Sequence, residues 1–234
     1  MLKLKLLLIV LVFAVPLPVA VGGKVRNHGL HALAEEEGVE NILECGVQKG
    51  SSTAAFLSAR PLRLHSVDIT KKIGFVDRLE RLAAQCGATS FQFLQQSSLE
   101  VKLKGEGALP APDLLFLDTL HAGPQLSREL SLLGPSVRRY IVLHDTATNA
   151  FEDEGAEHYP DLKGYNDQTS GSSDLPSFPG LWAAIIDFLV AFPEWFLALR
   201  CFNNCGLVVL RRSESAAKDA ESRRWLRTRT AWTV

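Results

Sequence analysis

Short apolar runs recur along the middle of the chain, separated by segments with a different pattern. The run 114–117, Leu-Leu-Phe-Leu, contains no polar residue, which is typical of a strand buried on both faces. The other runs have a similar length and are also rich in Leu, Ile, Val or Phe. Together they predict five strands, at residues 41–46, 62–68, 90–94, 113–118 and 140–144.

Between these runs, apolar residues lie three or four positions apart, as on one face of a helix. Residues 75–86 show this most clearly, and Gly87 follows as a helix stop. The same spacing predicts helices at residues 52–59, 124–133 and 181–192.

Two further strands are predicted near the end of the chain, at residues 195–200 and 207–210. Asn203, Asn204 and Gly206 lie between them, and such residues favour a hairpin turn. Alternating strands and helices predict an α/β fold. We expect a doubly wound, Rossmann-like sheet of about seven strands, five parallel plus a C-terminal antiparallel hairpin, with helices on both faces.

The first residues differ from this pattern. Lys3 and Lys5 precede an unbroken apolar run at 6–15, and Pro16 and Pro18 follow. This order is typical of a signal peptide, so residues 1–23 are predicted to be a signal peptide or membrane anchor. The alternative is a buried first helix. The first interpretation places the protein in the secretory pathway or at a membrane, with association through residues 1–23; otherwise it is cytoplasmic.

The remaining chain divides into a domain at 24–211 and a tail at 212–234 in which basic residues outnumber acidic ones. Residues 146–179 are rich in Gly, Ser, Asp and Pro, and a loop of this length inside a domain is typically a functional lid or disordered. Hydrophobic residues make up 47% of the chain, which indicates a globular protein, and the net charge of -1 argues against a nucleic-acid partner. Cys201 and Cys205 flank the predicted hairpin turn and could pair in an oxidising compartment.

A glycine-containing loop, residues 43–53, joins the first predicted strand to the first predicted helix. Gly46 and Gly50 allow a tight turn and a close approach to a ligand. The spacing matches neither the three-glycine dinucleotide motif nor a phosphate-binding loop that ends in Gly-Lys-Ser/Thr. The same glycines would also suit a plain strand-to-helix turn. Asp68 ends the second strand 22 residues after Gly46, where an acid can accept hydrogen bonds from ribose hydroxyls.

Acidic residues and histidines also follow the fourth and fifth strands. Asp118 and Asp145 are expected on neighbouring strands at the edge where ligands bind in open α/β sheets. Two adjacent carboxylates suit a hard cation such as Mg²⁺. His121 and His144 could add ligands or act as a general base. Each of these residues would also serve as an ordinary cap or polar neighbour.

These motifs resemble those of the class I S-adenosylmethionine-dependent methyltransferases. More narrowly, they resemble the cephalosporin hydroxylase-like and rhamnosyl O-methyltransferase-like group. The resemblance covers roughly residues 28–211, in order. The segments that carry it are 43–53, 67–68, 113–121, 141–146, 179–185, 193–195 and 203–207.

The resemblance implies a site for S-adenosylmethionine. Glu44, Gly46 and Gly50 would line its methionine and ribose parts, and Asp68 would hold the ribose. Gln96 and Ser97, after the third strand, fall where the family contacts the adenine.

The resemblance also places Asp118, His144 and Asp145 at the family's metal-binding and catalytic positions, with Mg²⁺ as a candidate ion. His144 departs from the more acidic site that the family often has. The implied activity is methyl transfer to a hydroxyl of a small molecule or sugar. The alternatives are a cephalosporin hydroxylase-like oxidoreductase, and a binding protein that keeps the fold without catalysis.

Overall fold

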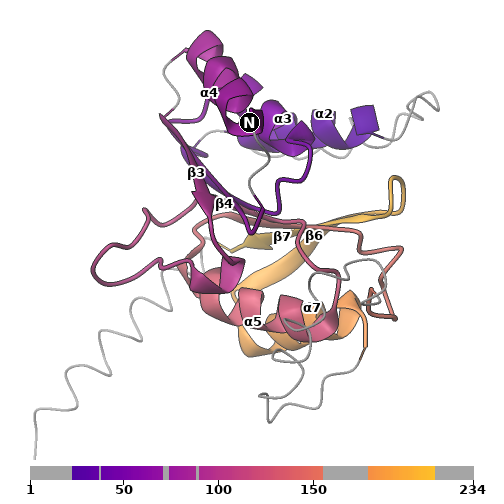
Figure 1. Cartoon of the computed structure of the whole chain (residues 1–234). Coiled ribbons are helices and arrows are strands. Elements are labelled where there is room, and N and C mark those ends of the chain that lie inside the picture. The colour runs from indigo at the N-terminus through magenta and orange to yellow at the C-terminus, as the bar shows by residue number, and fades with distance from the viewer. Residues whose placement is uncertain (1–22, 37, 71–73, 88–89, 155–178, 214–234) are drawn as a thin grey trace, which may run out of the picture.

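A computed structural model of the chain describes residues 23–36, 38–70, 74–87, 90–154 and 179–213 (Figure 1). The predicted signal peptide or anchor, nearly all of the basic tail and most of the predicted lid lie outside these residues. Within the described ranges, no helix is both long and apolar enough to cross a membrane.

The strands form one seven-stranded sheet in the order β3-β2-β1-β4-β5-β7-β6. The first five strands are mutually parallel, and β7 pairs antiparallel with both β5 and β6. The predicted fold is therefore confirmed, including the closing hairpin. The strands are β1 (Asn41–Cys45), β2 (Arg63–Asp68), β3 (Ser90–Gln95), β4 (Leu114–Leu117), β5 (Tyr140–His144), β6 (Trp195–Cys201) and β7 (Leu207–Arg212).

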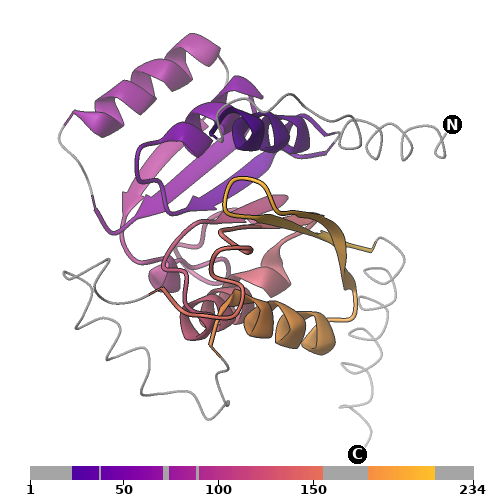
Figure 2. The ribbon, with the colours of Figure 1, turned by 90° about the vertical axis from the view of Figure 1, so that its right-hand side faces the viewer.

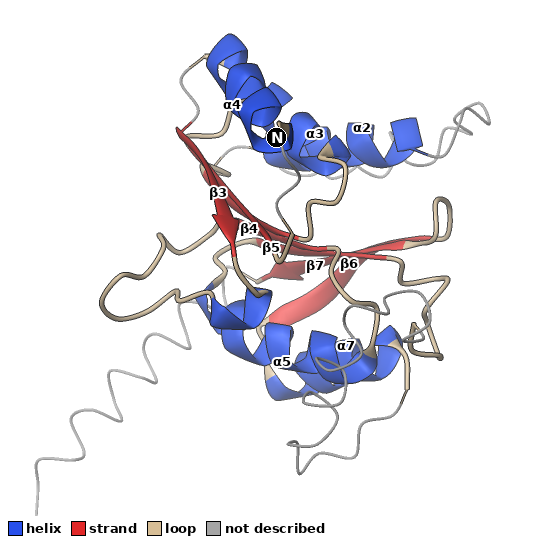
Figure 3. Ribbon diagram, in the orientation of Figure 1, coloured by secondary structure: helices blue, strands red, loops and turns tan. Residues whose placement is uncertain are grey.

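Helices cover both faces of this sheet, as Figure 1 and the secondary-structure colouring of Figure 3 show. One layer consists of α2 (Gly23–Ala34), α3 (Ser51–Ser58) and α4 (Phe75–Cys86), and the other contains α5 (Gly123–Leu133) and α7 (Leu181–Ala191). The side view in Figure 2 shows the sheet between these layers. The pattern did not predict α2, or the short 3-10 helices η1 (Ser98–Glu100) and η2 (Gly134–Ser136).

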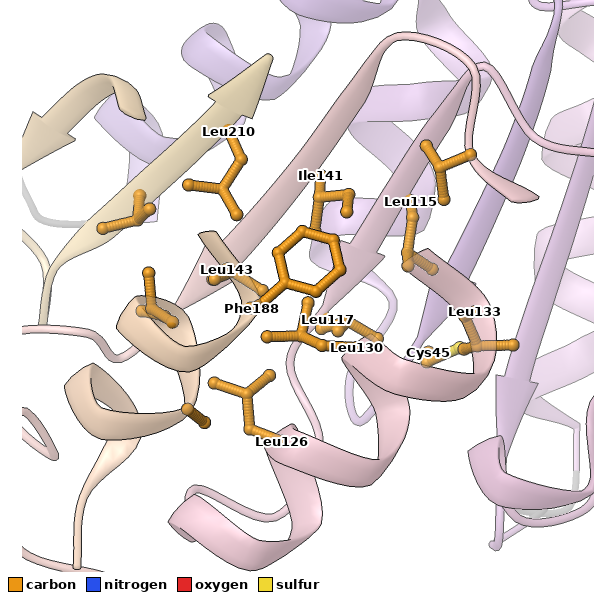
Figure 4. Close-up of a cluster of buried hydrophobic side chains, with 14 of the residues drawn as sticks. Cys45, Leu115, Leu117, Leu126, Leu130, Leu133, Ile141, Leu143, Phe188 and Leu210 are labelled. Atoms are coloured by element: carbon orange, nitrogen blue, oxygen red, sulfur yellow. The ribbon is translucent and has the colours of Figure 1, made fainter. Parts of the chain in front are cut away.

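The two layers are held by two separate hydrophobic clusters. Leu115 and Leu117 of β4 lie in the cluster beneath α5 and α7, whereas Leu114 and Phe116 lie in the cluster beneath α2 and α3. This alternation explains why β4 has no polar residue: both of its faces are buried. Figure 4 shows the α5–α7 cluster, in which Phe188 of α7 lies among leucines of α5 and the sheet.

The strand register brings the ends of three central strands to one level. Cys45 of β1 pairs with Leu117 of β4, and Leu117 pairs with Leu143 of β5. The residues that come next are Gly46, Asp118 and His144. Parallel strands end at the same edge, so the three sequence motifs converge there.

Candidate functional site

The site lies where the strand order reverses. Chain connections run outward from β1 to β2 and β3 on one side, and then return to β4 and β5 on the other. In open α/β sheets the crevice at such a reversal, beyond the carboxyl ends of the strands, is where ligands bind. The Asp-His cluster and the glycine loop described below lie at the carboxyl ends of β1, β4 and β5.

Two acidic residues and two histidines converge beyond β4 and β5. One potential ligand atom from each lies within 4.8 Å of the others. His121 Nε2 is 2.9 Å from Asp145 Oδ2 and 3.3 Å from Asp118 Oδ1. His144 Nδ1 is 3.0 Å from Asp118 Oδ1 and 3.3 Å from Asp145 Oδ1. We call these four residues the Asp-His cluster: Asp118, His121, His144 and Asp145.

The cluster is mostly buried, and its charges stabilise one another. Burial alone lowers the pKa of an imidazole, but hydrogen bonds and attraction to the two carboxylates raise the pKa of His121 to about 10 and of His144 to about 9. Burial opposes ionisation of Asp118 as well, yet the two histidines lower its pKa to about 2. They also hold the pKa of Asp145 well below its usual range. Without a bound ion, the cluster is therefore a charge-balanced set of two cations and two anions at neutral pH.

Residues outside the cluster orient the two imidazoles. The other ring nitrogen of His121, Nδ1, is 2.8 Å from Glu154 Oε2. The other ring nitrogen of His144, Nε2, is 3.5 Å from the side-chain amide of Asn204, in the β6–β7 hairpin. Asp153 accepts hydrogen bonds from the backbone N–H groups of Gly123 and Gly180, which fixes the segment that carries Glu154. Sequence reasoning missed Glu154 and treated Asn204 only as a turn residue, because neither directly follows a strand of the parallel part of the sheet.

The glycine loop borders the cluster directly. Gly46 has a φ of 89°, and a Cβ atom there would lie 2.0 Å from the carbonyl oxygen of Asp118. Gly50 has a φ of 73°, and its Cβ would lie 2.7 Å from the ring of Phe75. Both glycines are therefore required by packing of the loop itself, as the plain-turn alternative proposed. The contact between Gly46 and Asp118 also places the predicted cofactor loop beside the Asp-His cluster.

Asp68 holds the glycine loop in place. Its Oδ2 accepts hydrogen bonds from the backbone N–H groups of Val47 at 2.9 Å and Gln48 at 3.0 Å. Its Oδ1 accepts from the N–H and the hydroxyl of Thr70. A carboxylate has about four lone-pair positions, so a ribose would have to share these oxygens. The ribose-binding role of Asp68 stays a prediction.

Glu44 is a fully buried acid at the carboxyl end of β1. Its Oε2 accepts hydrogen bonds from Thr53 at 2.7 Å and Ser66 at 2.6 Å. Among the described residues, no group makes a well-formed hydrogen bond to its Oε1. Burial raises the pKa of Glu44 to about 7, although hydrogen bonds from Ser52, Ser66 and Thr53 oppose the rise. A buried oxygen without a partner is a feature that a polar ligand could satisfy.

The predicted adenine-binding residues lie one strand further out. Gln96 follows β3, and its N–H donates to the Asp68 carbonyl at 3.1 Å. Ser97 caps η1: its side chain accepts from the N–H of Leu99, and its own N–H donates to Glu100. The structure thus places Gln96 and Ser97 beside Asp68, at the same edge of the sheet. The contact with adenine stays a prediction.

A second buried carboxylate, missed by sequence reasoning, links two of these loops. Glu129 on α5 is fully buried and accepts hydrogen bonds from Ser98 after β3 and from Thr119 after β4. Gln125 donates a hydrogen bond to Glu129 at 2.9 Å, and burial raises the pKa of Glu129. The sequence did contain a signal, because Glu129 falls three residues after Leu126, on the apolar face of its helix.

Comparisons with known proteins give the fold. No protein-family model matches the chain, and no curated protein matches its sequence. Solved structures do match. The O-methyltransferase TomG from Streptomyces achromogenes, in complex with SAM (S-adenosylmethionine), has a TM-score of 0.53 at 18% identity, over 84% of this chain and 83% of that one. The O-methyltransferase from Bacillus cereus, in complex with SAH (S-adenosylhomocysteine), gives 0.51 at 15% identity over 89% of each chain.

A third structure, the magnesium protoporphyrin IX methyltransferase from Synechocystis with bound SAH, gives a TM-score of 0.52 at 15% identity, over 82% of this chain and 83% of that one. The chain therefore has the Rossmann-like fold of S-adenosylmethionine-dependent methyltransferases. Identities this low define the architecture and leave the chemistry to be argued from the site.

Proposed function

We propose that this protein is an S-adenosylmethionine-dependent O-methyltransferase that acts on a hydroxyl group of a small molecule or sugar. One observation carries the proposal: the glycine loop touches the Asp-His cluster at the Gly46–Asp118 contact. A donor bound along the loop would then lie next to residues able to orient an acceptor. Neighbouring structures that hold SAM or SAH on the same fold support this choice of cofactor.

The residues present fit this cofactor. S-adenosylmethionine supplies a methyl group on a positively charged sulfur. Within the described residues, the buried Glu44 Oε1 has no well-formed hydrogen bond that a ligand would have to displace, and the N–H groups at the start of α3 have no side-chain cap. Asp68 shapes the loop, and Gln96 and Ser97 lie where the nucleoside would extend. In this proposal the four residues hold the cofactor by position and charge, without covalent chemistry.

The Asp-His cluster would orient the acceptor. The cofactor, held by the glycine loop, would supply its methyl group to the acceptor oxygen, and the proton of the acceptor would pass to solvent. Positioning of the two reactants is the main task in such a transfer. The raised pKa of His144 means that its ring already holds a proton at neutral pH. A divalent ion in the cluster would lower the pKa of the hydroxyl instead.

Calorimetry with S-adenosylmethionine and with NAD tests the cofactor, and a screen of hydroxyl acceptors with and without added divalent ions tests the reaction. We expect the purified protein to bind S-adenosylmethionine and not NAD. Asp118→Ala should abolish methyl transfer while it keeps cofactor binding within about threefold, since its side chain belongs to the acceptor side. Asp77→Ala, at an exposed site on α4, is the control. Absence of S-adenosylmethionine binding would refute the proposal.

A further inference from the structure

His121 of the Asp-His cluster has an arrangement that an ordinary ion pair does not require. Each histidine ring of the cluster turns one nitrogen toward the carboxylates and the other toward an outer polar group. For His121 that outer group is Glu154 at 2.8 Å, and for His144 it is Asn204 at 3.5 Å. A histidine that binds a metal usually donates its outer N–H to an acceptor, as His121 can to Glu154. At His144 the facing atom is the Asn204 amide nitrogen, which is a donor and gives no such support.

The separations within the cluster also suit a single ion. The four contacts between a ring nitrogen and a carboxylate oxygen span 2.9 to 3.3 Å. Two ligands that each lie about 2.0–2.2 Å from one ion are about 2.8–3.6 Å apart, from octahedral to tetrahedral coordination angles. All four ligand atoms lie within 4.8 Å of one another. Small side-chain movements would therefore let them meet one ion.

The donor atoms indicate which kind of ion. Mg²⁺ favours oxygen ligands and retains several waters, whereas imidazole suits zinc and the neighbouring first-row transition metals. We propose that the Asp-His cluster is a binding site for an imidazole-preferring transition metal, represented by Zn²⁺, and that Glu154 orients His121. This departs from the Mg²⁺ that the two carboxylates suggested in the sequence. The proposal concerns ion binding alone, so it does not depend on methyl transfer.

The competing interpretation is that the four side chains only form a charge-balanced network around the end of the sheet. Calorimetry separates the two interpretations. The full chain without a tag, freed of metal by a chelator, is titrated at one neutral pH with Zn²⁺ or Mg²⁺, and without S-adenosylmethionine. We expect one Zn²⁺ per chain and an affinity at least about 100-fold above that for Mg²⁺. Titration with Co²⁺ should produce visible absorption from a protein-bound ion.

Three variants locate the ion. His121→Ala and His144→Ala should each weaken Zn²⁺ binding about 100-fold or more, and Glu154→Gln by about 10- to 100-fold, because it acts through His121. His31→Ala is the control: this ring on α2 pairs with Glu35, just after the helix, and its loss should leave Zn²⁺ binding unchanged. Melting curves identify any variant that fails to fold. Glu154→Gln retains every ligand, so it tests the site even if both histidine variants unfold.

Equal affinities for Zn²⁺ and Mg²⁺ would overturn the proposal, and so would Zn²⁺ binding that survives intact in the folded histidine variants or in Glu154→Gln. Loss of Zn²⁺ binding in His31→Ala would also contradict it, because the ion would then lie elsewhere. Cofactor binding is measured separately. A protein that binds Zn²⁺ at the cluster but no S-adenosylmethionine would refute the proposed function and leave the metal site standing.

Discussion

The buried acid Glu44 should make the stability of this domain depend on pH between about pH 4.5 and 7. Burial raises its pKa from 4.5 to about 7, so the folded state holds a proton that the unfolded state has already released. As the pH rises, the free energy of unfolding falls in any range where the folded state binds more protons than the unfolded state. The contribution of Glu44 is therefore fully present below pH 4.5, declines as the pH rises to about 7, and stays lost above that.

The size of the effect follows from the same two pKa values. Each pH unit of difference between the folded and unfolded pKa corresponds to about 1.4 kcal/mol. For Glu44 the difference between 4.5 and about 7 gives about 3 kcal/mol between acidic and alkaline conditions. Glu44→Gln removes the titration, so the free energy of unfolding of the variant should rise relative to the wild type by about 3 kcal/mol from pH 4.5 to pH 8.

Urea unfolding at several pH values, without cofactor, measures this difference. The glutamine amide in the Glu44→Gln variant can change the free energy of unfolding by an amount that does not depend on pH. This amount cancels, because only the change of the free energy of unfolding with pH is compared. His121 and His144 titrate above this window in the folded protein, and their contributions cancel between variant and wild type. Glu80→Gln, at an exposed site on α4, is the matched control and should change stability by less than about 0.5 kcal/mol. A difference between Glu44→Gln and wild type that stays flat across pH would refute the reasoning.

Substitutions of two other carboxylates, Asp68 and Glu129, test cofactor binding and the stability of the loops at the sheet edge, respectively. Asp68→Ala removes the acceptor for the Val47 and Gln48 N–H groups and the predicted ribose contact, so S-adenosylmethionine binding should weaken by about 1.5–3 kcal/mol in calorimetry; unchanged affinity would show the assignment to be wrong. Glu129→Ala leaves the hydroxyls of Ser98 and Thr119 without their shared acceptor, so it should lower the free energy of unfolding by about 2 kcal/mol or more in urea. A loss below about 0.5 kcal/mol would show that this network holds neither loop.

The sheet could be predicted because its strands carry their own signal. The apolar runs of β1, β4 and β5 are buried on both faces, so burial leaves a continuous mark in the sequence. Helix α2 has no comparable mark. Residues 23–34 include Gly23 and Gly29 and few apolar side chains, and the helix packs against α3 through residues such as Leu30 and Ala34. Tertiary packing stabilises α2 where its local pattern is weak.

The candidate site was predictable only in part, for a related reason. Asp118, His144 and Asp145 follow strands, and the rule that ligands bind at strand ends is enough to bring them to one edge. That rule does not reach Glu154, which acts through His121, or Asn204 in the β6–β7 hairpin. Their positions depend on how a loop and a turn pack against the sheet. No local pattern encodes that packing.

The backbone around the cluster indicates that this convergence is specifically built. Along a strand, neighbouring side chains point to opposite faces, so His144 and Asp145 would diverge if β5 simply continued. Asp145 instead has a φ of 56°, in the left-handed region that costs most residues about 1–2 kcal/mol, and its carboxylate comes within 3.3 Å of His144 Nδ1. Of the described non-glycine residues with positive φ, all but Arg60 lie in the glycine loop, in the cluster or in the hairpin turn beside it: Gln48, Asp145, Asn204 and Cys205. Strained backbone gathered around one group of charged side chains is typical of a functional site, and here it turns both residues of the His144–Asp145 pair toward Asp118 and His121.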